Sequence, residues 1–302
     1  MKKLSPEQYH RACEYIKQYA RPIDQSLFEY HFENGSNKKV VKNLEAFQNE
    51  DGGIGHGLEP DIRSSQSSPI ATSVAMQYAR EANLSWREPL IKSVMNYFTE
   101  IYEPNKKWPL KQVHMNTEPH ADWWHYTQEG DKFQVNPGAE IIGYYHAYPQ
   151  TIPVDLLPLF HDQIFQHLES QTSCVEYHEA LCFLRLANEI PDPGKTMIIE
   201  FLREWARNIV TLDPNRWDNY SAKPIWLAPH PYSPLYNALE DVICLNLDYE
   251  INQQQEDGSW VPNWEWGKYR SFWESTAKQE WQGYLTVKTL KVLKDYERID
   301  YI

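Results

Sequence analysis

The sequence predicts an all-α fold, and three observations lead to it. A short motif occurs twice, and each copy follows a stretch of helical character. Serine or asparagine followed by proline recurs at the start of apolar stretches, which is a helix-start signal. Apolar residues after such a start fall at helical spacing, as with Ile70, Val74 and Tyr78. A chain punctuated in this way is expected to consist of stacked helical hairpins.

The repeated motif reads QNEDGGI at 48–54 and QQEDGSW at 254–260. Each copy has a Gln, three residues, a Gly, one further residue and then a large apolar side chain. Glycine lets the backbone turn sharply where a helix stops, and Gln and Asp side chains hydrogen-bond groups left without partners at helix ends. We therefore expect each copy to join two helices, with Ile54 or Trp260 packed over the joint.

The second copy and the run STAKQEW at 275–281 together resemble the QW motif of squalene–hopene and oxidosqualene cyclases. Protein prenyltransferase β subunits share the fold of these enzymes. The first copy departs from the motif, because Ile54 stands in place of Trp. The resemblance implies a single α/α toroid over residues 1–302, a ring of about five or six helical hairpins around a cavity. It also implies that the N-terminal helices in 1–36 pack on the ring.

The catalytic motifs of that superfamily are absent. The chain has no Asp-x-Asp-Asp motif for protonating a polyene, no Asp-Asp-x-x-Asp motif for magnesium diphosphate and no Asp-x-Cys pair for zinc. A small-molecule ligand in the central cavity is therefore expected without a cofactor and without a metal. The fold is easier to infer than the function, since one fold serves many functions.

Helix signals follow one another along the chain. Ser5 and Pro6 start the first helix, a second ends at Asn34, and a third is expected at 37–49. Inner helices of the ring are expected to start at the caps Ser68, Asn136, Ser173, Ser233 and Ser275. Three of them carry a small residue that lets helices crowd together, namely Ala75, Gly143 and Ala180. Outer helices are expected at 87–102, 154–170 and 195–211. The alternative is that Ser and Asn cap helices here as they do everywhere.

The composition excludes several classes of partner. The 302 residues include 29 Lys and Arg against 42 Asp and Glu, and the net charge of −13 disfavours nucleic acid or an anionic membrane. The first residues have charges but no apolar segment, so no signal peptide is expected, and no apolar run is long enough for membrane insertion. The cysteines lie within helical patterns and are expected to be reduced in a cytoplasmic protein. The oligomeric state is left open.

Three long loops, 103–135, 212–232 and 256–274, contain most of the tryptophans. Loops of this length are uncommon without a purpose, and a loop Trp needs something to cover it. These loops are expected either to form a lid over the cavity or to bury their Trp side chains in satellite hydrophobic clusters.

The densest polar segment is 114–126, which contains three His and two carboxylates. Such side chains bind transition metals or shuttle protons. None of the spacings is that of a zinc site, and a solvated loop is the alternative. No metal site is predicted.

Carboxylates near the mouth of an aromatic cavity are the candidate catalytic groups, because an apolar setting raises the pKa of a carboxyl group. The predicted catalytic residues are Asp61, Asp122, His125 and Glu140. The predicted substrate-binding residues are Trp123, Trp124, Tyr144, Glu176 and Tyr177. The alternative is that carboxylates at helix starts only stabilise their helices.

Three functions follow from these observations. The first, implied by the resemblance, is a relative of the terpenoid cyclases and prenyltransferases that takes an apolar or amphipathic substrate. The second is a carbohydrate-active hydrolase or lyase, since two carboxylates across a pocket with Trp and Tyr suit glycosidic chemistry. The third is a non-catalytic binding or scaffold protein. A pocket lined by apolar atoms favours the first, and facing carboxylates favour the second.

Overall fold

The structure, a computed structural model, describes residues 1–102, 107–127, 133–153, 156–171 and 173–301. Within this part of the chain, 62% of the residues are helical and there are no strands, which confirms the all-α class. The predicted start of one outer helix, at Val154, lies outside the described residues. Among the described helices, none has both the length and the apolar character needed to cross a bilayer.

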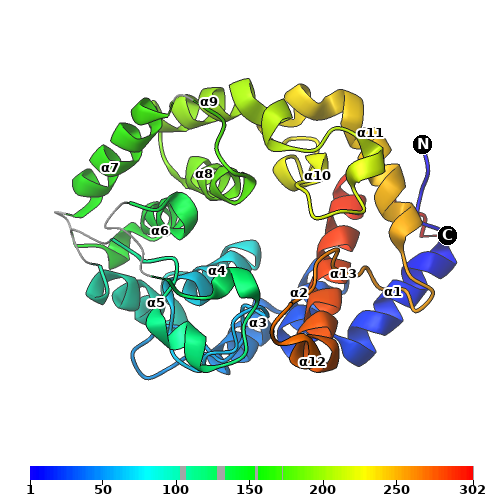
Figure 1. Cartoon of the computed structure of the whole chain (residues 1–302), viewed down its shortest axis with the longest axis horizontal. Helices are drawn as coiled ribbons and strands as arrows, with labels where there is room; N and C mark the ends of the chain where they lie inside the picture. The colour runs from blue at the N-terminus through cyan, green and yellow to red at the C-terminus, as the bar shows by residue number, and fades with distance from the viewer. Residues whose placement is uncertain (103–106, 128–132, 154–155, 172, 302) are drawn as a thin grey trace. The chain divides into compact units, whose positions relative to one another are not determined.

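The chain divides into two compact units, which are described separately (Figure 1). Unit 1 consists of Met1–Ser36 together with Arg203–Ile302, and unit 2 is the continuous segment Asn37–Leu202. The N-terminal segment 1–36 therefore groups with the last part of the chain. The single domain predicted over 1–302 stays a prediction.

Unit 2 is built around helices that approach one another closely. Its helices are α3 (Asn37–Glu45), α4 (Pro69–Glu81), α5 (Pro89–Glu100), α6 (Val135–Ala147), α7 (Leu156–Ser170) and α8 (Tyr177–Glu189), and α9 (Gly194–Ile209) contains the boundary with unit 1. Helix α6 packs along α8 and also against α4. A Cβ atom on Gly143 of α6 would lie 3.1 Å from the Cα of Leu186 in α8. The small residue predicted at this position is therefore needed for the close approach.

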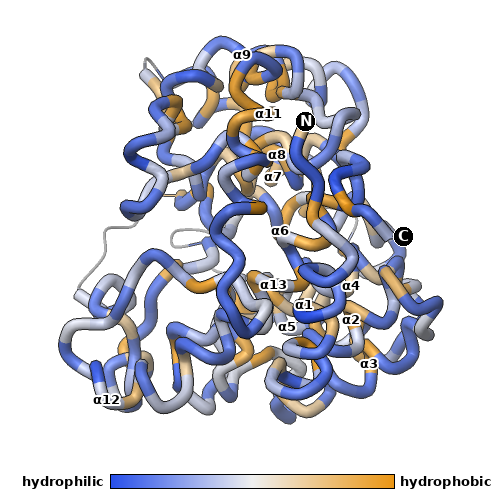
Figure 2. The backbone as a smooth tube through the Cα atoms, turned by 90° about the vertical axis from the view of Figure 1, so that its right-hand side faces the viewer, coloured by the Kyte–Doolittle hydropathy of each residue, from blue (hydrophilic) through white to orange (hydrophobic). Residues whose placement is uncertain are grey.

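Unit 1 brings the two ends of the chain together. Its helices are α1 (Pro6–Tyr19), α2 (Pro22–Phe32), α10 (Pro224–Leu227), α11 (Tyr236–Gln253), α12 (Arg270–Phe272) and α13 (Lys278–Asp295). Helices α1 and α2 pack against α13. Along most helices the chain alternates between hydrophobic and hydrophilic residues (Figure 2), as expected when one face of a helix is buried.

The predicted helix starts are confirmed at some positions and wrong at others. Ser5 caps α1 with a full capping box, and the Ser68 side chain caps α4. Asn136 has a non-helical backbone (φ −96°, ψ 115°) at a kink in α6, so regular helix begins after it at Pro137, as predicted. The caps predicted at Ser173, Ser233 and Ser275 are wrong. The observed N-caps of α8 and α11 are Glu176 and Leu235. Ser275 lies inside a π-helical turn (Trp273–Ala277) that continues into α13.

The two copies of the motif fold into the same turn, one in each unit. The Gln48 side chain donates an N–H to the carbonyl oxygen of Gly52 at 3.0 Å, and Gln254 donates to Gly258 at the same distance. Both glycines have a left-handed backbone, with φ of 85° and 93°. Each is also pressed against a helix: a Cβ on Gly52 would lie 2.5 Å from the carbonyl oxygen of Ser93 in α5, and the neighbour of Gly258 is α1. Glycine is required at both positions.

Each turn is closed by a threonine from the helix that follows. The backbone N–H of Ile54 donates to the Thr72 hydroxyl at 2.9 Å, and the N–H of Trp260 donates to the Thr286 hydroxyl at 3.0 Å. Ile54 and Trp260 are both buried, as expected for residues packed over a helix joint. The internal repeat read from the sequence is therefore a repeat of structure.

Several loop tryptophans are buried within their own unit. These are Trp108, Trp217, Trp260, Trp266 and Trp273. Trp108 packs with its ring centroid 5.1 Å from those of Tyr102 and Phe160, and its indole N–H donates to the carbonyl of Phe98. This arrangement favours a satellite hydrophobic cluster for Trp108, and the proposed lid stays a prediction.

Candidate functional site

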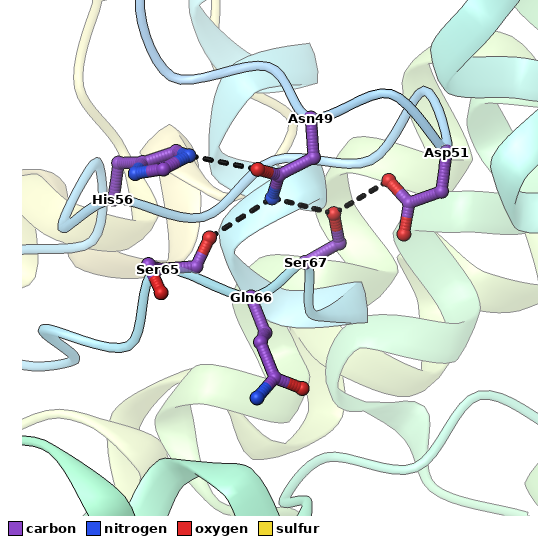
Figure 3. A pocket seen from close by; sticks show the side chains of 6 residues that line it. All are labelled: Asn49, Asp51, His56, Ser65, Gln66 and Ser67. Atoms are coloured by element: carbon purple, nitrogen blue, oxygen red, sulfur yellow. Dashed lines mark hydrogen bonds between the residues drawn. The ribbon is translucent and has the colours of Figure 1, made fainter.

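The first turn of the repeat opens into a pocket of about 310 Å³ in unit 2 (Figure 3). Its walls come from the turn after α3 and from the segment before α4. The lining side chains are all polar: Asn49, Asp51, His56, Ser65, Gln66 and Ser67. The pocket faces solvent, since His56 and Asp51 are exposed. None of these residues was among the predicted catalytic or substrate-binding residues.

Four side chains of the pocket form a continuous chain of hydrogen bonds (Figure 3). The Ser67 hydroxyl donates to the Asp51 carboxylate at 2.7 Å, and Asn49 Nδ2 donates to the same hydroxyl at 2.9 Å. Asn49 Nδ2 also donates to the carbonyl oxygen of Ser65 at 3.0 Å. His56 Nε2 lies 2.7 Å from Asn49 Oδ1. The chain thus runs from a carboxylate to an imidazole at the rim of the pocket.

The backbone around His56 has an unusual conformation. His56 has φ of 55°, and Gly57 beside it has φ of 76°. A non-glycine residue in the left-handed region carries strain, and such residues occur often at functional sites. The His56 N–H donates to the carbonyl of Ser64 at 2.9 Å, which holds the loop in place. The guanidinium of Arg63 lies directly over Gly57, where a side chain at position 57 would otherwise stand.

A second histidine, His114, supports the pocket from η1 (Val113–Thr117). Its Nδ1 lies 2.8 Å from the hydroxyl of the buried Ser64, and its Nε2 lies 3.0 Å from Gln112 Oε1. Burial lowers the pKa of His114, although the carbonyl of Ser67 acts in the opposite direction. The imidazole is therefore neutral at pH 7, and both ring nitrogens are occupied. This geometry indicates a bracing role for His114.

The predicted catalytic residues Asp61, Asp122 and His125 belong to two segments that lie side by side. The carbonyl of Asp61 accepts the N–H of Ala121 at 2.9 Å. Asp61 is buried, whereas Asp122 and His125 are exposed. His125 Nδ1 lies 3.1 Å from Nε2 of the buried His120, and the two rings stack. The backbone around Asp61 is therefore joined to the segment that carries Asp122 and His125. Their shared catalytic role stays a prediction.

The two tryptophans of this segment have different environments. Trp123 is 42% exposed, so its indole face is open to solvent. Trp124 is half-buried and packs against a small core of Ile62, Ile70 and Met115. Trp124 thus holds the segment on the start of α4, and only Trp123 presents an aromatic face to a ligand.

Glu140 and Tyr144 belong to a separate buried cluster between α4, α6 and α8. The Glu140 carboxylate is 1% exposed and accepts hydrogen bonds from Ser73, Gln77 and Arg185. The Tyr144 hydroxyl donates to the carbonyl of Ser73 at 3.1 Å. Burial raises the pKa of Tyr144, and the charge of Glu140 adds to the shift, so the phenol stays protonated.

This satisfied network favours a structural role for the Glu140 cluster. A carboxylate that already holds three donors has little capacity left for a substrate, and a buried polar network with all members bonded fixes a core. Its catalytic role stays a prediction.

Glu176 and Tyr177 lie at the start of α8. Glu176 is the N-cap and accepts the N–H of His178 at 2.9 Å. Partial burial alone would raise the pKa of Glu176, but the hydrogen bond and the charge of His178 lower it below its ordinary value. The ring of Tyr177 lies 3.8 Å from that of His178. These contacts match the alternative in which a carboxylate at a helix start stabilises its helix.

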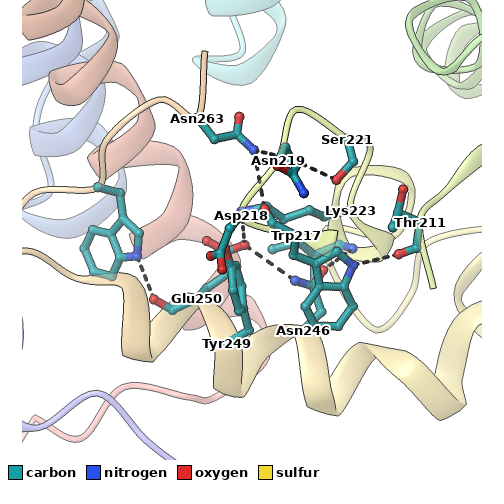
Figure 4. A network of polar contacts seen from close by, with 12 residues as sticks. Thr211, Trp217, Asp218, Asn219, Ser221, Lys223, Asn246, Tyr249, Glu250 and Asn263 are labelled. Carbon is teal, nitrogen blue, oxygen red and sulfur yellow. Dashed lines mark hydrogen bonds and ion pairs between the residues drawn. The ribbon is translucent and has the colours of Figure 1, made fainter. Parts of the chain in front are cut away.

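Unit 1 contains a polar network between α10 and α11 that reaches its own turn at Trp260 (Figure 4). The buried ion pair Lys223–Glu250 has an N–O distance of 2.7 Å. Asn246 accepts the N–H of Ile225 and lies next to Glu250. The Trp260 indole donates to the carbonyl of Glu250 at 2.8 Å. This network fastens α10 to α11, and its bonded partners indicate a structural role.

Neither turn presents a metal centre in the residues that the structure describes. Over those ranges there is no group of three or more His, Cys, Asp or Glu side chains placed to hold a metal ion. The stacked His120 and His125 have no third ligand of that kind within the described part of the chain.

Comparison of the two turns separates the contacts that both of them make, which are needed for folding, from the residues that only the first turn has. The Gln, Gly and Thr contacts occur in both copies. In contrast, the positions of Asn49 and His56 are taken by Gln255 and Pro262 in the second copy. Gln255 turns its amide to the carbonyl of Gln253. This difference between aligned copies was visible in the sequence and is the signal that points to His56.

Comparison of the chain with known protein families, with curated proteins and with solved structures finds no match. The resemblance to the terpenoid cyclases and prenyltransferases is therefore carried only by the motif residues.

Proposed function

We propose that unit 2 binds a small polar molecule in the pocket formed by Asn49, Asp51, His56 and Ser65–Ser67. The observation that carries this proposal is the polar lining of the pocket. Amide, carboxylate, hydroxyl and imidazole groups match the hydroxyls of a polar ligand. An isoprenoid needs apolar and aromatic walls, which this pocket does not offer. A hydroxyl-rich molecule of the sugar class fits best.

The exposed Trp123 adds support for this ligand class. Trp123 lies two residues after Ala121, whose N–H donates to the carbonyl of Asp61 in the loop that also carries the pocket residues. An aromatic face of this kind suits the apolar face of a sugar ring. The proposal therefore favours the carbohydrate function over the terpenoid function.

The test is a binding screen by ligand-observed NMR with the intact chain. The panel contains neutral mono- and disaccharides and, as the opposing class, farnesol. We expect a sugar to bind and the Asn49→Leu variant to lose that binding. Gln255→Leu, at the same position of the second turn, is the matched control and should bind like the unchanged protein. Binding of farnesol alone, or equal binding by both variants, would show that the proposal is wrong.

We also propose that the chain forms an α/α toroid and that the protein is cytoplasmic. The toroid is supported by one turn built twice, since a ring of hairpins repeats its joints. The four cysteines are free thiols, which supports a reducing compartment such as the cytoplasm. A crystal structure of the chain and fractionation of the cell test these two points.

A further inference from the structure

We propose that His56 is the hydrogen-bond-accepting group that the unit 2 pocket offers to a ligand hydroxyl. A directional chain of hydrogen bonds, from Asp51 through Ser67 and Asn49, fixes its imidazole in the form protonated at Nε2. The inference rests on the proposed function, because the bound ligand supplies the hydroxyl that donates to His56.

The direction of the chain is set at Asp51. A carboxylate only accepts hydrogen bonds, and Asp51 Oδ1 accepts from the Gly53 N–H at 2.9 Å and from the Ser67 hydroxyl at 2.7 Å. The single hydroxyl proton of Ser67 is therefore used. Its remaining lone pairs face Asn49.

The orientation of the Asn49 amide follows from its two acceptors. The carbonyl oxygen of Ser65 and the lone pair of Ser67 both require a donor, and Asn49 Nδ2 supplies an N–H to each, at 3.0 and 2.9 Å. With both amide protons directed to these acceptors, Oδ1 is turned to His56. An amide oxygen accepts hydrogen bonds and does not donate them.

His56 must therefore donate. Its Nε2 lies 2.7 Å from Asn49 Oδ1, so the proton of the neutral imidazole is on Nε2 and the lone pair is on Nδ1. The side chain is exposed at the rim of the pocket. A hydroxyl of a bound ligand can therefore donate a hydrogen bond to the Nδ1 lone pair. The Nε2–H keeps its bond to Asn49, so ligand binding leaves the chain of hydrogen bonds undisturbed.

The second turn shows that this chain is not required for folding. Pro262 takes the position of His56, and Gln255 takes that of Asn49 without making the equivalent bonds. The second turn nevertheless keeps its Gln, Gly and Thr contacts. The first turn thus carries an imidazole and its support in addition to the shared contacts, with the backbone of His56 in the left-handed region.

The test is ¹⁵N NMR of the imidazole nitrogens in the ligand-free chain at alkaline pH. We expect a roughly tenfold excess of the Nε2–H form, the ratio that one net hydrogen bond supports. Ser67→Ala and Asn49→Leu should bring the two forms towards equal populations. Gln255→Leu should leave the ratio unchanged.

An Nδ1–H form in the unchanged protein, or a ratio that both variants leave intact, would overturn the inference. The tautomer is measured in the unchanged protein, so this part of the test holds even if a variant fails to fold. The measurement needs no ligand. A negative binding screen with a confirmed tautomer would contradict the proposed function only, whereas ligand binding with the wrong tautomer would contradict only the role of His56.

Discussion

Ser67 occupies the space that a side chain on Gly53 would need. A Cβ atom on Gly53 would lie 2.6 Å from the Ser67 Cβ and 2.8 Å from its Oγ. In the second turn the position of Gly53 is taken by Ser259, whose own hydroxyl donates to Asp257 at 2.7 Å. The hydroxyl that Ser259 provides within the second turn is therefore provided in the first turn by Ser67, which lies later in the loop. Because Ser67 also lines the pocket, this hydroxyl links the first turn to the pocket.

Gly53→Ser should destabilise the protein by about 1 to 3 kcal/mol, because the new side chain competes with Ser67 for one space. Adding Ser67→Gly should restore at least half of the loss, since the pair then copies Ser259. Chemical denaturation of the single and double variants gives the coupling free energy.

Additive effects of Gly53→Ser and Ser67→Gly would contradict the shared space. The edge of the Tyr97 ring would also lie 2.7 Å from a Cβ atom at position 53, so recovery is expected to be incomplete. Ser259→Gly, in the second turn, should cost stability without any rescue by Ser67→Gly.

Glu140→Gln should lower the free energy of unfolding by about 2 to 3 kcal/mol. The change removes the charge that faces Arg185, and breaking a buried ion pair costs more than losing an exposed one. This value is lower than the cost of breaking a fully buried ion pair, because the Arg185 side chain is 36% exposed and solvent screens its charge. Thermal unfolding measures the change.

Glu265→Gln provides the matched control for Glu140→Gln. Glu265 pairs with Arg270 on the surface, with both side chains more than half exposed. Its loss should change the free energy of unfolding by less than about 1 kcal/mol. Equal effects of the two substitutions would show that the Glu140 network does not brace the core of unit 2.

Trp260→Ala should destabilise the protein by about 3 to 5 kcal/mol, because the ring is 3% exposed and its indole N–H donates to Glu250. Ile54→Ala, at the same place in the first turn, should cost about 2 to 5 kcal/mol. Melting temperatures of both variants check the expectation. A stable Trp260→Ala protein that has lost ligand binding would assign this residue to a pocket instead.

Acid should weaken unit 2 through the stacked pair His146–His161, whose Nε2 atoms lie 2.7 Å apart. Burial lowers the pKa of His146 to about 4, and the neighbouring His161 adds to the shift. Burial also lowers the pKa of His161, against the opposing charge of Asp162. The unfolded imidazoles take up protons near their ordinary pKa of about 6.5. The contribution of this pair is therefore complete above that pH and is lost as the pH falls towards 4.

The His161→Phe variant separates this effect from other acid titrations. Its stability between pH 7 and 4.5 should fall by about 1 kcal/mol less than that of the unchanged protein, a value reduced because both side chains are partly exposed. Parallel curves for His161→Phe and the unchanged protein would refute the effect.

Much of the helical framework was predictable, because it depends on local signals. Ser5 with Pro6 and Ser68 with Pro69 start helices as expected. Asn34 ends the second helix region with φ of 54°. The caps predicted at Ser173, Ser233 and Ser275 failed, because Ser is able to cap in many places and its presence alone does not mark a helix start. Ser275, for example, is carried inside the helical stretch that begins at Arg270.

The pocket was harder to predict than the turn that forms it. The motif marked residues 48–54, but the contacts of Asn49 reach Ser65 and Ser67, 16 and 18 residues further on. No local pattern indicates which loop residues fold back onto an amide. Glu140 and Glu176 were predicted to belong to the site because they are carboxylates at helix starts. In the structure, Glu140 accepts a hydrogen bond from Arg185 and Glu176 accepts one from the His178 N–H, both within the helical framework.

The two turns differ in the order in which each turn and the helix it packs against are synthesised. Gly52 rests on α5, which follows it closely in the chain, so the first turn can form as soon as unit 2 has been synthesised. Gly258 rests on α1, and Gln254 donates to the carbonyl of Gln8, 246 residues earlier. Contacts of such long separation form late. During translation, the faces of α1 and α2 that pack against α13 therefore stay uncovered until this last helix has been synthesised.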